Sequence, residues 1–209
     1  MYIPGPDREE RLAVLHDVMR ANSFATIVSV GEDGIVATHL PLLLDPNRGR
    51  FGTLIGHLAR ANPHWRAFSG EHDSLAIFQG PHAYISPSWY TAPYAVPTWN
   101  YVAVHAYGRP RLIDDPAALY QIVADMTRTY EASFATPWEL EPRRDYAEKL
   151  IKNIVGFELE ILRLDGKRKL SRGRSPADRT GVIAGLASQN DALGADIAAL
   201  MREQLPAET

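Results

Sequence analysis

Polar side chains interrupt several apolar, strand-like segments, and their types suit the binding of a planar, anionic ligand. An arginine and the free amides of a helix start can hold a phosphate. A tryptophan can cover an aromatic ring, and threonine, histidine and asparagine can meet ring carbonyls and nitrogens. Taken singly, each such residue also fits an ordinary core role, because buried polar groups are generally hydrogen-bonded. The set comprises Thr38, His39, His57, Arg60, Asn62, Gln79, His82, Trp89, Thr98, Trp99 and Asn100.

Other kinds of chemistry find no support. The chain has no cysteine, which excludes disulfides, thiolate metal ligands and cysteine nucleophiles. It also lacks the glycine-rich nucleotide loops, the H-E-x-x-H metal motif and the G-x-S-x-G nucleophile motif. The seven histidines show no paired metal spacing. We therefore predict no metal site.

The elements that must position these side chains follow from hydrophobic periodicity and from turn residues. Three cap-plus-proline starts, Asn62-Pro63, Asp115-Pro116 and Ser175-Pro176, each predict the beginning of a helix. Gly80-Pro81 and Asp165-Gly166 predict breaks in strands. Helices are expected over 8–22, 62–68, 116–130, 144–153, from 175 and over 191–201, and strands over 24–30, 35–44, 51–57, 75–79, 83–85, 98–113 and 155–164.

These strands do not alternate with helices in βαβ fashion, which favours a mainly β, antiparallel barrel or sandwich with peripheral helices. We see no repeat, no low-complexity segment and no linker. We predict one domain over 1–209, with a helical C-terminal part from about residue 175.

Hydropathy, the first residues and the net charge limit where the protein can reside and what it can bind. The longest apolar run, 40–44, contains Pro41 and is far too short to span a membrane, and the first residues lack signal-peptide features. We expect a cytoplasmic protein with no membrane contact. The net charge of -3 and the absence of a helix-turn-helix with a basic reading helix argue against specific DNA binding.

A basic stretch between residues 163 and 179 leaves a weaker contact with DNA open. It contains Lys167, Arg168, Lys169, Arg172 and Arg174. One interpretation is a solvated hairpin and loop. The other is a patch that associates with DNA in a salt-sensitive, sequence-blind way.

Five segments also resemble a known family. They are ATHLPLLL (37–44), GHLARANPHWRAF (56–68), IFQGPHAYISPSWY (77–90), VPTWNYVAVHAYG (96–108) and IVGFELEI (154–161). They cover nearly the entire chain in order, and they resemble the PaiB-like, FMN-binding family of negative transcriptional regulators. Its members are named protease synthase and sporulation negative regulatory proteins.

The resemblance implies an FMN-binding split β-barrel, related to pyridoxamine 5'-phosphate oxidase-like folds, with FMN at a homodimer interface. It implies that the segment from His57 through Arg60 to Asn62 meets the FMN phosphate. It also implies that 38–40 and 98–100 line the isoalloxazine ring or the ribityl chain. With Gln79 and Trp89, the predicted cofactor-binding residues are Thr38, His39, Leu40, His57, Arg60, Asn62, Gln79, Trp89, Thr98, Trp99 and Asn100.

The chain departs from the family pattern in three places, and the departures at Ala92, Arg172 and Gly173 bear on flavin affinity. Ala92 stands where the family often has a lysine shortly after its SWY motif. Arg172 and Gly173 follow Lys169-Leu170-Ser171, where the family often reads KLSQN. Asp7 stands near a position that is usually aromatic.

Three functions remain open. The first is a flavin-binding regulator without an evident DNA-reading helix. The second is an FMN-dependent oxidoreductase acting on a small molecule, since a flavin supplies the reactive group and no catalytic side chain need be visible. The third is a partner-binding barrel with a vacant pocket, which flavin absorbance in the purified protein would exclude.

Overall fold

The computed structural model describes residues 1–69 and 72–205. The chain divides into two compact units, and each is assembled from separate stretches of sequence. Unit 1 comprises Met1–Ala21, Gln79–Val104 and Asp165–Thr209, and unit 2 comprises Asn22–Phe78 and His105–Leu164. Strands β6 (Ser74–Ile85) and β7 (Thr98–Gly108) contribute residues to both. The single domain expected from the sequence stays a prediction.

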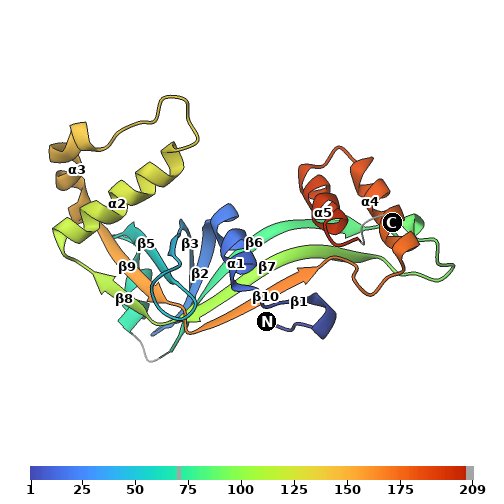
Figure 1. Ribbon diagram of the computed structural model, residues 1–209. Coiled ribbons are helices and arrows are strands. Elements are labelled where there is room, and N and C mark those ends of the chain that lie inside the picture. Colours follow the sequence, from blue (N-terminus) through green and yellow to red (C-terminus); the bar gives the residue numbers. More distant parts are fainter. Residues whose placement is uncertain (70–71, 206–209) are drawn as a thin grey trace. The chain divides into compact units, whose positions relative to one another are not determined.

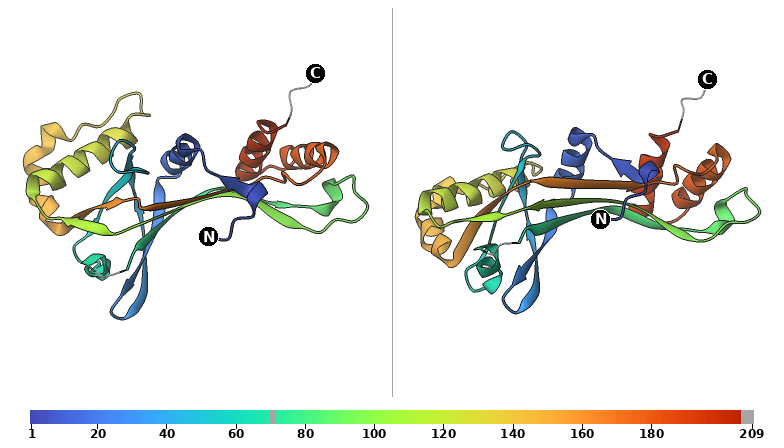
Figure 2. Two further views of the ribbon diagram at one scale, coloured as in Figure 1. Left: turned by 60° about the horizontal axis from the view of Figure 1, so that its bottom comes forward. Right: turned by 90° about the horizontal axis from the view of Figure 1, so that it is seen from below.

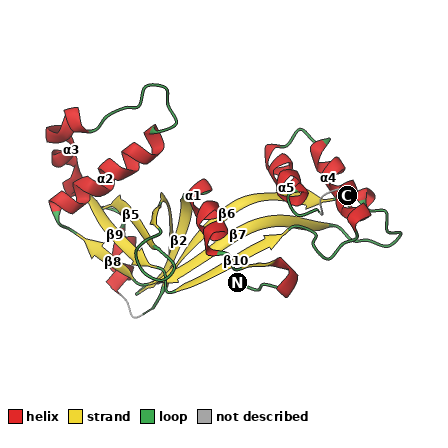
Figure 3. Ribbon diagram, viewed as in Figure 1, coloured by secondary structure: helices red, strands yellow, loops and turns green. Residues whose placement is uncertain are grey.

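Unit 2 is rich in antiparallel strands. Its four-stranded sheet has the order β4 (Leu43–Asp45), β5 (Thr53–Ala59), β9 (Ile154–Glu160) and β8 (Pro110–Ile113). The hairpin of β2 (Phe24–Gly31) and β3 (Gly34–Pro41) pairs through β2 with the first part of β6. Strands and helices are distinguished by colour in Figure 3.

Helical segments accompany the four-stranded sheet. Helices α2 (Pro116–Glu131) and α3 (Arg144–Leu150) lie beside it in the views of Figure 2. Short 3-10 turns are η2 (Pro63–Ser69), η4 (Glu141–Arg143) and η5 (Ile151–Asn153). Asp115 caps α2 by accepting from Ala118 N at 2.8 Å, which confirms the predicted start.

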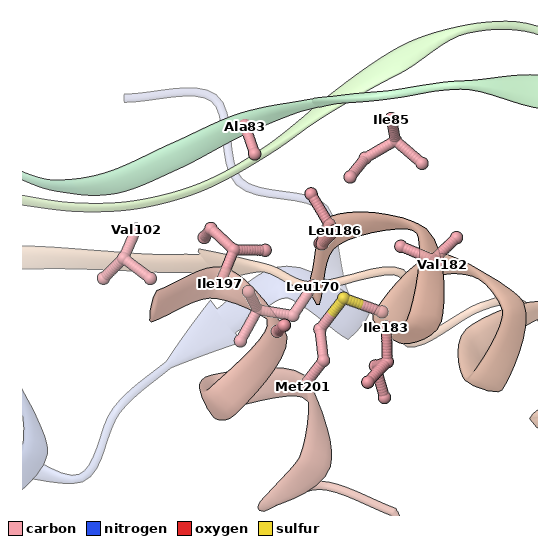
Figure 4. Close-up of a cluster of buried hydrophobic side chains, with 10 residues drawn as sticks. Ala83, Ile85, Val102, Leu170, Val182, Ile183, Leu186, Ile197 and Met201 are labelled. Atoms are coloured by element: carbon pink, nitrogen blue, oxygen red, sulfur yellow. The ribbon is translucent and has the colours of Figure 1, made fainter. Parts of the chain in front are cut away.

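Unit 1 places two helices against long strands. Helices α4 (Pro176–Ala187) and α5 (Ala192–Arg202) lie side by side near the later part of β6 (Figure 1). Figure 4 shows Val182, Leu186 and Ile197 pointing toward Ala83 and Ile85 of β6. Unit 1 also holds η1 (Gly5–Asp7), β1 (Arg8–Glu9), α1 (Leu12–Ala21), η3 (Pro87–Trp89) and most of β10 (Arg163–Lys169).

Ser175 caps α4, as predicted, by accepting from Asp178 N at 3.1 Å. The predicted C-terminal helix over 191–201 is confirmed as α5, with Asp191 as its cap. None of the described helices is both long and apolar enough to cross a membrane.

Three predicted strand boundaries are wrong, and close backbone approaches at glycines explain them. Strand β6 runs through Gly80-Pro81, where a Cβ on Gly80 would lie 3.1 Å from Val102 of β7. The predicted strand 98–113 divides after Gly108, whose Cα lies too near the backbone of Glu160 for any side chain. At this close approach the chain passes from one sheet to another, because β7 belongs to the six-stranded sheet and β8 belongs to the four-stranded sheet.

The third is Asp165-Gly166, which does not turn the chain. It lies inside β10, and Gly166 pairs with Glu9 of β1. A Cβ on Gly166 would overlap Leu15 of α1, so glycine permits this packing.

Other predicted segments need smaller corrections. The first helix begins at Leu12 because Arg8–Glu9 form β1. The predicted strand 35–44 is interrupted at Leu42, whose N–H donates to Ser23 O at 2.9 Å. The predicted helix 144–153 ends in the 3-10 turn η5.

Candidate cofactor-binding site

The predicted cofactor-binding residues fall into two groups, one in each unit. Unit 2 holds Thr38, His39, Leu40, His57, Arg60 and Asn62. Unit 1 holds Gln79, Trp89, Thr98, Trp99 and Asn100. That these residues bind a cofactor stays a prediction, and each group is described by itself.

In unit 2, Thr38 and Asn62 contact each other, and both contact the buried His64. Thr38 Oγ1 accepts from Asn62 Nδ2 at 3.1 Å and lies 2.8 Å from His64 Nδ1. Asn62 Oδ1 accepts from His64 N at 3.0 Å, so Asn62 caps the start of η2 as its sequence signature predicts. Thr38 and Asn62, far apart in sequence, therefore bond to each other directly, and His64 contacts Thr38 through its imidazole and Asn62 through its backbone N–H.

The same imidazole reaches deeper into unit 2. His64 is 2% exposed, and its Nε2 lies 2.9 Å from Ser29 Oγ, which in turn lies 2.7 Å from Ser74 Oγ. Burial lowers the pKa of His64 below its ordinary value. A neutral imidazole has one donor and one acceptor nitrogen, so it can donate to one of the two neighbouring hydroxyls and accept from the other.

His39 and Leu40 point to opposite sides of β3, as alternate residues of a strand must. Leu40 is 4% exposed and belongs to the core, so its side chain is not available to a ligand. His39 is exposed, and its Nδ1 lies 2.9 Å from Thr26 Oγ1 on the paired strand. Of this pair, His39 alone presents a side chain that a cofactor could contact.

His57 carries an unsatisfied polar atom. It lies in β5 opposite Gly156 of β9, and its buried Nδ1 has no hydrogen-bond partner within the described residues. Burial lowers the pKa of this imidazole as well. An unpartnered ring nitrogen that stays neutral is suited to a hydrogen bond with a neutral polar group of a bound cofactor.

Arg60 is engaged with the protein itself. Its Nε donates to Lys152 O at 3.0 Å, and its Nη2 donates to Ile154 O and to Asp114 Oδ1, both at 3.0 Å. Its backbone O accepts from Trp65 Nε1 at 3.1 Å. This arginine therefore joins the start of η2 to the segment before β9, and its predicted phosphate contact competes with these acceptors.

In unit 1, Thr98 and Asn100 of β7 line a cavity of about 290 Å³. Thr98 Oγ1 accepts from Lys169 Nζ at 2.6 Å. Asn100 is fully buried, and its Nδ2 donates to Ser171 Oγ at 3.0 Å. Thr98 thus contacts the last residue of β10, and Asn100 contacts the segment that follows this strand.

The remaining predicted residues of unit 1 lie elsewhere. Gln79 is exposed on β6, and Trp99 is 51% exposed with its ring 5.7 Å from that of His82. Trp89 packs on α4, where a Cβ at Gly181 or Gly185 would overlap it. The packing of Trp89 against α4 is a role that the sequence pattern does not reveal.

Comparison with known proteins identifies the family. Residues 1–163 match the family described as "Putative FMN-binding domain". The chain is also 35% identical over 208 residues to protease synthase and sporulation protein PAI 2 of Bacillus subtilis, covering 98% of both chains. The chain belongs to this FMN-binding family. The resemblance seen in the sequence is thereby confirmed, and FMN is the cofactor that family membership assigns.

Solved structures with low sequence identity share the fold of this FMN-binding family member. The conserved hypothetical protein Rv2991 of Mycobacterium tuberculosis has a TM-score of 0.59 at 11% identity, covering 84% of this chain and 94% of its own. The flavocytochrome Anf3 of Azotobacter vinelandii has a TM-score of 0.55 at 13% identity, covering 77% and 68%. The predicted mainly β fold of the split-barrel type with peripheral helices is confirmed.

The polar atoms of this family member fit parts of FMN. The Nδ1 of His57 has no hydrogen-bond partner among residues 1–69 and 72–205, and the unit 1 cavity gathers basic and hydroxyl side chains. FMN supplies redox chemistry when it is bound, whereas the chain supplies binding and orientation. The contacts of His64, Ser29 and Ser171 are not predictable from the sequence, because a lone histidine or serine carries no spacing signal.

Proposed function

We propose that this chain is an FMN-binding regulatory protein that acts as a homodimer without reading DNA through a helix. Its membership of the FMN-binding family carries the proposal, together with its 35% identity to a protein named for protease synthase and sporulation. Because that likeness extends over 98% of both chains, the proposal concerns the protein as a whole.

The surface chemistry of the C-terminal helices supports a role without specific DNA contact. Arg179, the basic residue of α4, is buried, and α5 carries Arg202 together with Asp196. A reading helix in the major groove needs several exposed side chains that reach base edges. We expect any DNA association to be weak and to disappear as salt rises.

The basic stretch that follows β9 is less exposed than a solvated loop would be. Lys167 and Arg168 are 6% and 7% exposed, and Arg168 pairs with Glu9 and Glu203, both at 3.6 Å. These two side chains are therefore buried in the fold, which further reduces the positively charged surface area available to DNA.

The deciding experiment is a spectrum and a mass spectrum of the full-length protein as purified. We expect flavin absorbance and release of FMN on denaturation. A colourless protein that takes up no FMN at micromolar concentration would contradict the proposal. A footprint on one operator that survives competitor DNA at physiological salt would contradict the expectation that the protein does not read DNA specifically.

The oxidoreductase alternative is tested on the same holoprotein. Oxidation of a reduced nicotinamide dinucleotide (NADH or NADPH) is followed over many equivalents of the bound flavin, with oxygen as the electron acceptor that is reduced to hydrogen peroxide. Sustained turnover would favour an enzyme, and a single reduction of the flavin without turnover would favour regulation. Shared fold with a flavocytochrome is compatible with either outcome, since fold does not determine function.

A further inference from the structure

The cavity in unit 1 gathers positive charge at the end of β10. Its lining includes Asp7, Tyr90, Thr98, Lys169, Arg172 and Arg174. The lining carries three cations and one carboxylate, which leaves an excess of two positive charges. Residues 169–174 also lie beyond the part of the chain that matches the FMN-binding family.

The three cations are held in place by neutral groups. Lys169 Nζ donates to Thr98 Oγ1, and Arg172 Nε donates to Gln204 Oε1 at 2.9 Å. The Arg174 guanidinium lies 4.4 Å from the centre of the Tyr90 ring. Within residues 1–69 and 72–205, none of the three forms an ion pair with a carboxylate. Half-buried cations without counter-ions attract an anion.

The turn that carries these cations has an unusual backbone. Ser171 has a φ of 56°, and among the described residues it is the only non-glycine residue with a positive φ. Such a conformation is sparsely populated for serine and persists where surrounding contacts enforce it. Buried Asn100 supplies those contacts, because its Nδ2 donates to Ser171 Oγ at 3.0 Å and its Oδ1 can accept from the same hydroxyl at 3.2 Å.

Two further polar atoms at this place lack partners. Tyr90 is a lining residue of the cavity, and its Oη is buried without a hydrogen bond among the described residues. The same holds for Nε2 of Gln204, whose Oε1 accepts from Arg172. Buried donors without partners are rare, and a bound ligand is one explanation for them.

We propose that this cavity binds a phosphate group. Arginine, lysine and hydroxyl side chains are the usual donors to phosphate oxygens, and the three cations, which form no ion pair among the described residues, favour a ligand that carries more than one negative charge. The phosphate has two possible sources, the FMN cofactor itself or a separate phosphorylated small molecule. In the first case the inference rests on the proposed function, and in the second it is independent of it.

The test compares three variants of the full-length protein, each of which removes one unit of charge. Arg172→Gln removes one cavity cation, Asp7→Asn removes the cavity carboxylate, and Arg202→Gln removes an exposed cation of α5 outside the cavity lining. Inorganic phosphate is titrated calorimetrically at constant ionic strength into the protein as purified. FMN and riboflavin are titrated separately into flavin-free protein.

The cavity predicts opposite effects for its two variants. Arg172→Gln should lower the affinity for the phosphate-bearing ligand at least about tenfold. Asp7→Asn should raise this affinity, and Arg202→Gln should change it little. If the cofactor supplies the phosphate, Arg172→Gln weakens FMN and leaves riboflavin unchanged. If a separate molecule supplies it, the inorganic phosphate titration responds and both flavins bind as in the wild type.

The proposal is overturned if Arg172→Gln and Arg202→Gln give equal changes for phosphate and for FMN. It is also overturned if FMN and riboflavin weaken together with no phosphate response, which would assign Arg172 to the fold. A protein that binds no flavin would defeat the proposed function, and the inorganic phosphate titration would still report on the cavity.

Discussion

Thr38 Oγ1 lies 2.8 Å from His64 Nδ1, and this contact joins strand β3 to the turn that follows β5. His64 also contacts Ser29 Oγ on β2. One buried imidazole therefore links three elements of unit 2, and its removal should be felt in the stability of that unit.

We expect His64→Leu to destabilise the protein by about 2–4 kcal/mol. Two hydroxyls each lose a partner at about 1–3 kcal/mol, and the lower part of the combined range applies because Thr38 keeps Asn62 and Ser29 keeps Ser74 as partners. Denaturant unfolding followed by far-ultraviolet circular dichroism measures the change. The matched variant Thr38→Ser keeps the hydroxyl and should cost less than about 1.5 kcal/mol. Equal stability of His64→Leu and the wild type would contradict the linking role.

The same residue gives a prediction for pH. Burial lowers the pKa of His64 below its usual value of 6.5, so the folded state binds fewer protons than the unfolded state. Stability should therefore be highest above about pH 6.5 and should fall as the pH drops below that value. His57 shifts in the same direction, so His64→Leu should reduce this slope without abolishing it. An unchanged slope in the variant would exclude His64 as a source.

Glu9 gives a second, more acidic transition. Hydrogen bonding from Arg11 is the main cause that lowers the pKa of Glu9 to about 2, and Arg168 contributes. A depressed carboxyl pKa stabilises the fold above the ordinary value of about 4.5 and ceases to do so as pH falls toward 2. We expect Glu9→Gln to cost about 1.5–3 kcal/mol at pH 7.

The difference between Glu9→Gln and the wild type should vanish near pH 2, measured by denaturant unfolding across the pH range. Glu10→Gln is the matched control, because Glu10 has a side chain that is 78% exposed and reaches Arg8 only at 3.9 Å. A difference that stays constant with pH would assign the loss to packing and not to charge.

Arg60→Ala separates a structural role from a phosphate contact. Its guanidinium already donates to Lys152 O, Ile154 O and Asp114. We therefore expect a loss of about 1 kcal/mol in stability, seen as a melting temperature about 2–4 °C lower, and equal changes in affinity for FMN and riboflavin. A loss of about tenfold for FMN alone would instead support the phosphate contact predicted from the sequence.

The homodimer is tested at an exposed aromatic segment of unit 1. Tyr94 is 93% exposed and Trp99 is 51% exposed, which is unusual for large apolar side chains on a monomer surface. We expect the wild type to be a dimer at micromolar concentration by light scattering, and Tyr94→Glu to shift it toward monomer. Phe134→Glu, at a 61% exposed position of unit 2, serves as the control. A wild-type monomer that still holds FMN would refute the dimer.

The sequence alone determined the elements whose signals are local. The starts of α2 and α4 follow from Asp115-Pro116 and Ser175-Pro176, because a cap side chain and a fixed proline φ act within one turn of helix. The family was also readable, because the motifs that carry it are contiguous strings.

The tertiary structure decided what depends on two distant segments meeting. Gly108 and Gly166 look like ordinary turn residues, yet their missing side chains make room for Glu160 and for Leu15. Likewise, Arg60 has the type and position of a phosphate ligand, but Asp114 and two carbonyls far along the chain occupy its donors. Hydrogen bonds and steric exclusion act over a few ångströms of space, and separation along the chain carries no information about which groups will share that space.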